Sequence, residues 1–483
     1  MRDLSPLFAT DSVRRFEAGA IASAADGAAL MERAGQAAWR RALELWPAAT
    51  RLLVICGAGG NGGDGFVFAR LAHESGRAVT VVEHAPRGIH HAAAAASRAR
   101  FVDAGGRVEP WCGTLPEAEV VVDALLGIGL SAEPRNDAAA AIAAINAHGA
   151  PVLALDVPSG VDARGIAGDA VRAWATIEFL LPKAVLRSGP ALERAGRLTC
   201  ATLDVAGVGY PAPDAWQADA SSLARWLPPR RVDTHKGEQG RVACVGGDAG
   251  SAGAILLCAE AAARTGAGLV RVHTRDAHHA ALLARRPELM ATPECEGVDV
   301  DWPDAIVVGP GLGQGNWGFA HLHRVLEADT PCVLDADALT IVARHGLALP
   351  ARTVLTPHPG EAARLLGIAT ADVQRDRFGA AAAIAERYRA TVVLKGAGTL
   401  VCAPGHAPVV LDAGNPGMAT GGMGDVLAGT IAALLGQDMA PFDAACAGAL
   451  LHSAAGDAAA AEGQRGLLAA DLMPHLRRLT NPA

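Results

Sequence analysis

The residues with the clearest chemical use in this sequence lie in a glycine-rich segment, GGMGD (Gly421–Asp425). An apolar helical pattern, VLAGTIAALLG, follows at once, so the glycines expose backbone N–H groups to an anion at a helix N-terminus. Asp425 could accept a proton from a substrate hydroxyl, which is the role of the carboxylate in phosphoryl transfer. The alternative is a helix N-cap aspartate, but NPGMATGGMGD holds more glycine than a cap requires. The segment predicts a phosphoryl-transfer site with Asp425 as its base.

Two polar motifs follow predicted strands in the same half of the chain. LKGAGT (Leu394–Thr399) carries Lys395 and Thr399, which could bind a nucleotide phosphate or ribose, although a solvated loop lysine is the simpler alternative. TPHPGE (Thr356–Glu361) places His358 between two prolines, and a rigid turn with an incidental histidine explains it equally well. Each motif is weak alone, so both depend on the segment that ends in Asp425.

A second glycine-rich segment, CGAGGNGGDGFVF (Cys56–Phe68), lies between a buried-strand pattern and a helical pattern. Its glycines fit the GxGxxG spacing of a dinucleotide-binding turn, and Glu83 follows at an offset suited to a ribose hydroxyl. Asp64 argues against a pyrophosphate in this turn, because a phosphate at a helix N-terminus needs N–H donors without a negative charge beside them. The charge therefore favours a different ligand.

Oxygen-bearing side chains follow the neighbouring predicted strands of the first half. Asn61, Asp123 and Ser159 would meet at one edge, because ligands in open α/β sheets bind at the carboxyl ends of the strands. An amide carbonyl, a carboxylate and a hydroxyl are ligands that suit a hard cation. The alternative is that Asp123 and Asp156 only cap the helices that follow them. The set as a whole favours a cation site.

Strands and helices must alternate to position these groups, and the first half shows that pattern. Its apolar runs are continuous rather than alternating, which is typical of parallel strands covered on both faces. A helical pattern precedes the first strand, over residues 26–46. The first half therefore predicts a Rossmann-like, doubly wound α/β sheet. The expected strands are Arg51–Cys56, Ala78–Glu83, Glu119–Ala124, Pro151–Val157 and Ala175–Leu180.

A proline-rich stretch without periodicity, residues 209–230, separates this series from a second α/β series. We expect two domains, residues 1–215 and 225–483. The expected strand segments of the second domain are Arg241–Gly247, Gly268–Thr274, Ala305–Gly311, Pro331–Asp337, Thr353–Glu361 and Thr391–Thr399.

Length and composition limit the class of protein. At 483 residues the chain is long enough for two or three domains, and 51% hydrophobic residues allow sizeable cores. The net charge of -8 argues against a general nucleic-acid binder. Nine scattered cysteines without a CxxC pair suggest reduced thiols, and no apolar run approaches a membrane span. We expect a cytoplasmic protein that binds neither nucleic acid nor membrane and forms a homo-oligomer.

The first half resembles the NAD(P)HX epimerase domain, the YjeF N-terminal family. The resemblance is carried by ALMERAG, CGAGGNGGDGFVFAR, DALLGIGL, LALDVPSGVD and LPK, in this order, and it covers most of residues 1–215. It implies a potassium ion held by Asn61, Asp123 and Ser159. Asp156 and Lys183 are our candidates for proton transfer at the hydrated nicotinamide carbon, since inversion of a C–O stereocentre requires an acid and a base.

The same resemblance implies which residues contact the hydrated cofactor. They are Gly60, Asn61, Gly62, Gly63, Asp64, Gly127, Ile128, Gly129, Leu130, Ser131, Ala132, Glu133 and Asp156. This chain departs from the family pattern at Gly60, where the family usually has an asparagine. It also lacks the arginine that usually follows the segment ending in Leu130, and Arg135 is a shifted substitute.

The second half resembles the ADP-dependent NAD(P)HX dehydratases of the ribokinase-like fold. HKGEQGRV, SAGAILLCAEAAARTGAGLV, VVGPGLG, LDADAL, LTPHPGE, LKGAGT and NPGMATGGMGDVLAG carry the resemblance. It implies that Ala254, Gly313, His358 and Asp425 contact the hydrated cofactor, with Asp425 as the catalytic base. The nucleotide would be bound, together with magnesium, by Lys395, Gly396, Ala397, Gly398, Thr399 and Gly424.

Together the two resemblances imply a bifunctional repair enzyme for NADHX and NADPHX, the hydrated forms of NADH and NADPH. The first domain would interconvert the R and S epimers, and the second would dehydrate the S epimer with ADP. One alternative is a ribokinase-like kinase of a vitamin-precursor heterocycle. In that alternative the N-terminal domain would be a non-catalytic ligand-binding module.

Overall fold

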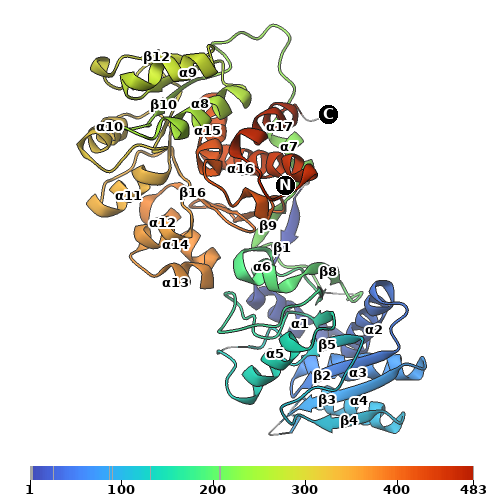
Figure 1. Ribbon diagram of the computed structural model, residues 1–483. Coiled ribbons are helices and arrows are strands. Elements are labelled where there is room, and N and C mark those ends of the chain that lie inside the picture. Colours follow the sequence, from blue (N-terminus) through green and yellow to red (C-terminus); the bar gives the residue numbers. More distant parts are fainter. Residues whose placement is uncertain are drawn as a thin grey trace. The chain divides into compact units, whose positions relative to one another are not determined.

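The computed structural model describes residues 4–24, 27–85, 88–89, 91–130, 132–205 and 208–481. The chain divides into two compact units (Figure 1). One unit is Pro6–Ala215, and the other runs from Trp216 onward and takes in Leu4 and Ser5. We call them the N-terminal and C-terminal units.

The N-terminal unit is built on a seven-stranded sheet in the order β4-β3-β2-β5-β6-β7-β8, and every neighbouring pair is parallel. The order reverses direction beside β2, which is where ligands bind in a doubly wound sheet. The predicted Rossmann-like fold is confirmed. Its elements are α1 (Thr10–Ala24), α2 (Gly27–Leu45), β2 (Arg51–Gly57), α3 (Gly60–Glu74), β3 (Ala78–His84), α4 (Ala92–Asp103), β4 (Arg107–Pro110), β5 (Val120–Ala124), α5 (Asp137–Ala147), β6 (Val152–Leu155), β7 (Ala175–Phe179), α6 (Gly189–Ala195) and β8 (Arg197–Ala201).

Alternate side chains of β2 enter two separate cores, as the period of a strand requires. Leu52 and Val54 pack with Phe66 and Phe68 of α3, whereas Leu53 and Ile55 pack with α5 on the other face. Both faces of the sheet are therefore covered, which explains why the strands read as continuous apolar runs.

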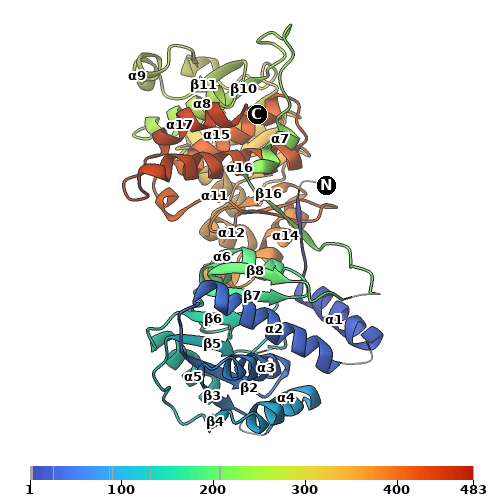
Figure 2. The same ribbon diagram turned by 90° about the vertical axis from the view of Figure 1, so that its right-hand side faces the viewer.

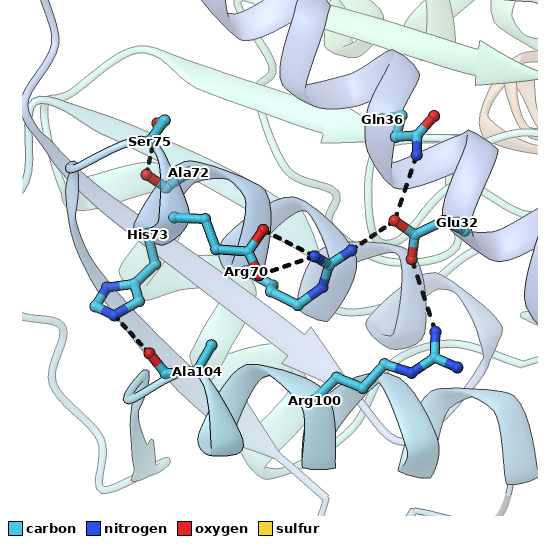
Figure 3. A network of polar contacts seen from close by, with 9 residues as sticks. Glu32, Gln36, Arg70, Ala72, His73, Ser75, Arg100 and Ala104 are labelled. Carbon is cyan, nitrogen blue, oxygen red and sulfur yellow. Dashed lines mark hydrogen bonds and ion pairs between the residues drawn. The ribbon is translucent and has the colours of Figure 1, made fainter.

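Polar contacts hold the outer side of α3 to α2 and α4 (Figure 3). The Arg70 guanidinium donates to Glu32 of α2 at 2.5 Å and to Glu74 at 2.9 Å. Glu32 also accepts from Gln36 and lies 4.0 Å from Arg100 of α4. These contacts fix α3, whose first turn faces the cavity described below.

The C-terminal unit is built on a sheet in the order β1-β9-β18-β17-β16-β15-β14-β13-β10-β11-β12. The strands from β16 to β12 in this order are parallel, and β17 runs antiparallel to both its neighbours. The strands are β1 (Ser5–Leu7), β9 (Ala215–Ala218), β10 (Arg241–Val245), β11 (Leu269–His273), β12 (Met290–Thr292), β13 (Ala305–Val308), β14 (Cys332–Leu334), β15 (Thr353–Leu355), β16 (Thr391–Leu394), β17 (Leu400–Cys402) and β18 (Val409–Leu411).

Helix α15 packs against both α8 and α16, and the three helices share one apolar core with this sheet (Figure 2). No helix in the described ranges combines the length and hydropathy of a membrane span. The helices are α7 (Leu223–Trp226), α8 (Ala252–Arg264), α9 (His279–Arg285), α10 (Asn316–Leu326), α11 (Ala336–His345), α12 (Pro359–Leu366), α13 (Thr370–Arg375), α14 (Arg377–Tyr388), α15 (Met423–Gly436), α16 (Pro441–Ala459) and α17 (Leu472–Leu479).

Candidate functional site

A cavity of about 920 Å³ lies at the switch point of the N-terminal sheet, beside the carboxyl ends of β2 and β5. Helix α1 supplies a further part of its wall, through Val13, Arg14, Glu17 and Ile21, which the sequence analysis did not select. The volume suits a sizeable organic ligand. The predicted substrate residues that line it are Gly60, Asn61, Asp64, Gly127, Ile128, Gly129, Leu130, Ala132 and Asp156.

The glycine-rich segment after β2 is helical, although the sequence suggested a turn before the helix. Helix α3 begins at Gly60 and so includes Asn61 and Asp64 in its first turns. A β-carbon at Gly62 would come within 1.9 Å of the carbonyl oxygen of Gly57. This close approach of helix and strand explains why glycines occupy positions at which helix propensity alone would disfavour them.

Of the predicted substrate residues of the N-terminal unit that the structure describes, three are not among those that line the cavity. Gly62 packs against the end of β2, and Gly63 lies so close to Met31 of α2 that a β-carbon would meet its sulfur at 2.4 Å. The Glu133 carboxylate is directed toward Gly168. Ser131 lies outside the described residues.

Two of the three predicted potassium ligands, Asn61 and Ser159, contact the backbone of Leu126, and the third, Asp123, contacts Ser159. Asn61 Nδ2 donates to the Leu126 carbonyl at 3.1 Å, and the Leu126 amide donates to Ser159 Oγ at 2.8 Å. Ser159 Oγ in turn donates to Asp123 Oδ1 at 2.6 Å. Burial raises the pKa of Asp123 to about 6, against the hydrogen bonds from Ser159 and Leu125. Asn61 Oδ1 is buried without a hydrogen-bond partner among the described residues. An orphaned carbonyl oxygen beside a buried carboxylate fits a hard cation.

Asp156 and Lys183 form a buried ion pair, with Lys183 Nζ 2.7 Å from Asp156 Oδ1. Lys183 is fully buried, and its ammonium also donates to the carbonyls of Phe179 and Leu181 at 3.0 and 3.3 Å. Burial lowers the pKa of Lys183, but Asp156 and Glu178 outweigh it, so the net shift is upward. Asp156 lines the cavity, whereas Lys183 lies behind it. The Asp156 carboxyl group therefore lines the cavity, and its partner, the Lys183 ammonium, is not part of the lining.

The second site lies at the carboxyl ends of the C-terminal strands, where Gly424 meets two charged groups. A β-carbon at Gly424 would lie 3.2 Å from Lys395 Nζ and 3.4 Å from Asp335 Oδ2. Asp425 follows in the first turn of α15, after Gly422 with its left-handed φ of 90°. The structure thus brings the GGMGD segment against the lysine of LKGAGT.

Lys395 is held by two acids that the sequence analysis did not select. Its ammonium lies 2.7 Å from Asp335 Oδ1 and 3.8 Å from Glu361. Asp335 is buried and also accepts from Thr356 Oγ1 at 2.8 Å. Burial raises the pKa of Glu361 to about 7, although Lys395 lowers it. Asp335 lies in the motif LDADAL and Glu361 in LTPHPGE. Both motifs follow predicted strands, and this position could have identified the two acids as site residues from the sequence.

Asp425 has the electrostatic setting of a general base. Burial raises its pKa to about 7, Asp335 adds to that shift, and Lys395 opposes it. A base with a pKa near the working pH is half ionised and still basic enough to take a hydroxyl proton.

The remaining predicted residues lie on loops at the same strand ends. His358 Nδ1 accepts from the Gly360 amide at 2.9 Å, and burial lowers the pKa of His358, with Lys395 adding to the shift. Gly313, with a φ of 72°, lies after β13 against Asp248, and Ala254 lies in the first turn of α8.

The predicted nucleotide loop ends strand β16. Gly396 and Gly398 take left-handed φ values of 125° and 58°, and Thr399 Oγ1 donates to the Gly396 carbonyl at 2.9 Å. The buried Arg377 donates to the carbonyls of Leu394 and Lys395 at 3.2 and 3.1 Å. These contacts fix the turn that carries Lys395.

Comparison with known families matches both halves of the chain. Residues 242–478 match the NAD(P)H-hydrate dehydratase model, and residues 27–185 match the model of the YjeF-related protein N-terminus. The bifunctional NAD(P)H-hydrate repair enzyme of Escherichia coli K12 is 44% identical over 94% of this chain and 89% of its own length. The corresponding enzyme of Coxiella burnetii is 44% identical over 99% of this chain and 100% of its own length.

Solved structures match the C-terminal half. A ribokinase-like superfamily protein from Enterococcus faecalis is 30% identical with a TM-score of 0.51, over 55% of this chain and 94% of that one. An ADP/ATP-dependent NAD(P)H-hydrate dehydratase from Bacillus subtilis, co-crystallised with ATP and Mg²⁺, is 30% identical with a TM-score of 0.50, over 54% of this chain and 95% of that one. The predicted ribokinase-like fold is confirmed, and the chain belongs to the family of bifunctional NAD(P)H-hydrate repair enzymes.

Proposed function

We propose that this chain restores hydrated NADH and NADPH in two steps, with one step in each unit. The N-terminal unit interconverts the epimers at the hydrated ring carbon, and the C-terminal unit dehydrates the S epimer with ADP. The observation that supports this most directly is the position of Asp425, a half-buried carboxyl with a pKa of about 7 in the first turn of α15. Phosphoryl transfer needs one such group to receive the proton of the attacking hydroxyl.

In the dehydration step Asp425 accepts the proton of the ring hydroxyl as its oxygen attacks the terminal phosphorus of ADP, and AMP leaves. Phosphate then leaves the ring carbon with the C–O electron pair, and loss of a ring proton restores NAD(P)H. Lys395 and the N–H groups around Gly424 stabilise the negative charge that the phosphoryl group carries. Asp335 and Glu361 supply carboxylate oxygens, which fit a magnesium ion that accompanies the nucleotide.

In the epimerisation step the orphaned carbonyl of Asn61, with Asp123 and Ser159, would hold potassium beside the cavity. A bound cation there would neutralise the buried Asp123 and fix the loop after β5 that lines the cavity. Asp156 acts as a base at the ring hydroxyl. We also propose that the protein forms a homo-oligomer and acts in the cytoplasm.

One reaction tests both steps. Purified protein is mixed with both epimers of hydrated NADPH, potassium, magnesium and ADP, and NADPH absorbance is followed. We expect a fast phase from the S epimer, then a slower phase limited by epimerisation of the R epimer. Failure to form NADPH with ADP or ATP would contradict the dehydratase. A slow phase at the spontaneous rate would contradict the epimerase and leave the N-terminal unit as a binding module.

Replacement of potassium by lithium in that mixture tests the cation site. We expect the slow phase to fall while the fast phase keeps its rate, and Asn61→Ala should raise the potassium concentration needed for half-maximal epimerisation. Equal slow phases in both salts would argue against a potassium role in the N-terminal unit.

A further inference from the structure

One face of helix α1 forms part of the N-terminal cavity wall. Val13, Arg14, Glu17 and Ile21 all line the cavity, at the spacing of a single helix face. The Arg14 guanidinium donates to the carbonyl of Ile128, on the loop after β5. Glu17 lies three residues further along the same helix face, so this hydrogen bond also holds the part of α1 that carries Glu17 at the cavity wall.

The Glu17 carboxyl lies close enough to Asp64 and Asp156 for their charges to interact, and it has no hydrogen bond or ion pair with the described residues. It is largely shielded from solvent, and Asp64 and Asp156 line the same cavity. Burial raises the pKa of Glu17, and the charge of Asp156 adds to that shift, while Lys183 and Arg14 oppose it. Three carboxyl groups thus share the cavity, and the Lys183 ammonium pairs with one of them, Asp156.

Lys183 is poorly placed to be the second proton-transfer group. Its ammonium already has three oxygen acceptors, and the side chain has no exposed surface. Its ammonium pairs with Asp156 and so positions that side chain at the cavity. Inversion of a C–O stereocentre still needs a proton donor as well as an acceptor, and the two must reach opposite faces of the ring. Asp156 comes from a strand end and Glu17 from α1, so the two arise from different walls of the cavity.

We propose that Glu17 is the catalytic acid that works with Asp156 in epimerisation, a role that rests on the proposed epimerase function. Glu17 gives its proton to the ring hydroxyl, the C–O bond breaks with its electrons on oxygen, and water leaves as the ring nitrogen forms a C=N bond. Water then adds to the opposite face, the C=N electrons return to nitrogen, and Asp156 takes the proton of the added water. This leaves Glu17 as a carboxylate and Asp156 protonated. The other epimer reacts with the two roles exchanged, and after a turnover in one direction proton exchange with solvent water restores the starting states of both carboxyl groups.

The two-phase NADPH assay on the full chain tests this role. Glu17→Gln keeps the size and hydrogen-bonding capacity of the side chain but cannot transfer a proton. We expect its slow, epimerisation-limited phase to fall about 100-fold or to the spontaneous rate, whichever is reached first, with the KM for the R epimer little changed. The fast phase should keep its amplitude and rate, because it reports the other unit. Glu17→Asp, which retains an acid on a shorter stem, should recover part of the slow phase.

Glu44→Gln, on the exposed surface of α2, is the matched control and should leave both phases unchanged. Near-ultraviolet circular dichroism of Glu17→Gln should match that of the wild type. A wild-type slow phase in Glu17→Gln would overturn the proposal. So would loss of that phase in Asp64→Asn with Glu17→Gln unaffected, because Asp64 would then be the acid. If the slow phase of the wild-type protein itself runs at the spontaneous rate, the epimerase function is contradicted, because no variant could then lower that rate.

Discussion

Gly424 leaves room for Lys395: a β-carbon at position 424 would lie 3.2 Å from the Lys395 ammonium nitrogen. The glycine therefore has a second role besides exposing N–H groups at the start of α15. It lets the helix terminus approach the Lys395–Asp335 pair, so that the charges of both groups act on Asp425.

The first prediction concerns that approach. Gly424→Ala should displace the Lys395–Asp335 pair and lower kcat/KM for ADP about tenfold or more, since positioning dominates phosphoryl transfer. Steady-state kinetics on the S epimer measures it. Gly421→Ala is the matched control, because a β-carbon there meets nothing within 4 Å. Equal loss in both variants would show that a methyl group anywhere in the glycine-rich segment, and not the contact with Lys395, is responsible.

The second prediction concerns pH. The pKa of Asp425 is raised to about 7, so the carboxylate that serves as base is lost below that pH. The kcat/KM for dehydration should rise with pH and level off above about 7. The pKa of Glu361 is also about 7, so the profile of Glu361→Gln decides between them. If Asp425 causes the fall in kcat/KM below pH 7, Glu361→Gln should still show that fall. Loss of the fall in Glu361→Gln would assign it to Glu361.

The third prediction concerns the buried ammonium of Lys183. Lys183→Met leaves Asp156 without its cation and should destabilise the N-terminal unit by about 3–5 kcal/mol, as expected when one partner of a buried pair is removed. Because the pKa of Lys183 is raised in the folded state, wild-type stability from this group is present at neutral pH and declines only at alkaline pH. Urea unfolding measures the difference. The exposed Lys236→Met is the control and should change stability by less than about 0.5 kcal/mol.

The fourth prediction separates two glycines of the same helix turn. Gly60 has open space where a β-carbon would be, whereas a β-carbon at Gly62 would lie 1.9 Å from the carbonyl oxygen of Gly57. Gly60→Asn should fold with wild-type stability, and we expect a lower KM for hydrated NADPH in epimerisation. Gly62→Ala should destabilise the unit by about 1–3 kcal/mol through overpacking. Thermal unfolding compares the two, and equal destabilisation would contradict the difference in space.

The sequence was sufficient for the parallel strands and for the motifs at their ends. Continuous apolar runs predicted β2, β3, β5 and β10 within about two residues, because a strand covered on both faces has no polar alternation to disguise it. Short or edge strands such as β4 and β12, and the antiparallel β17 and β18, were missed, since three or four residues carry too little pattern.

The partners of each functional group were decided only by the tertiary structure. Sequence reasoning selected Asp425 and Lys395 from their glycine-rich surroundings, but not Asp335, which meets Lys395 from sixty residues away. Sequence reasoning paired Lys183 with Asp156. It did not predict that Lys183 is buried and that its ammonium has three oxygen acceptors. Nothing in the local sequence distinguished Glu17. A single acid on an amphipathic helix can be recognised as part of a site only when the fold places that helix in the cavity wall. Motifs specify chemistry through residue type and spacing, whereas charge pairing and burial depend on chain segments that meet only in the fold.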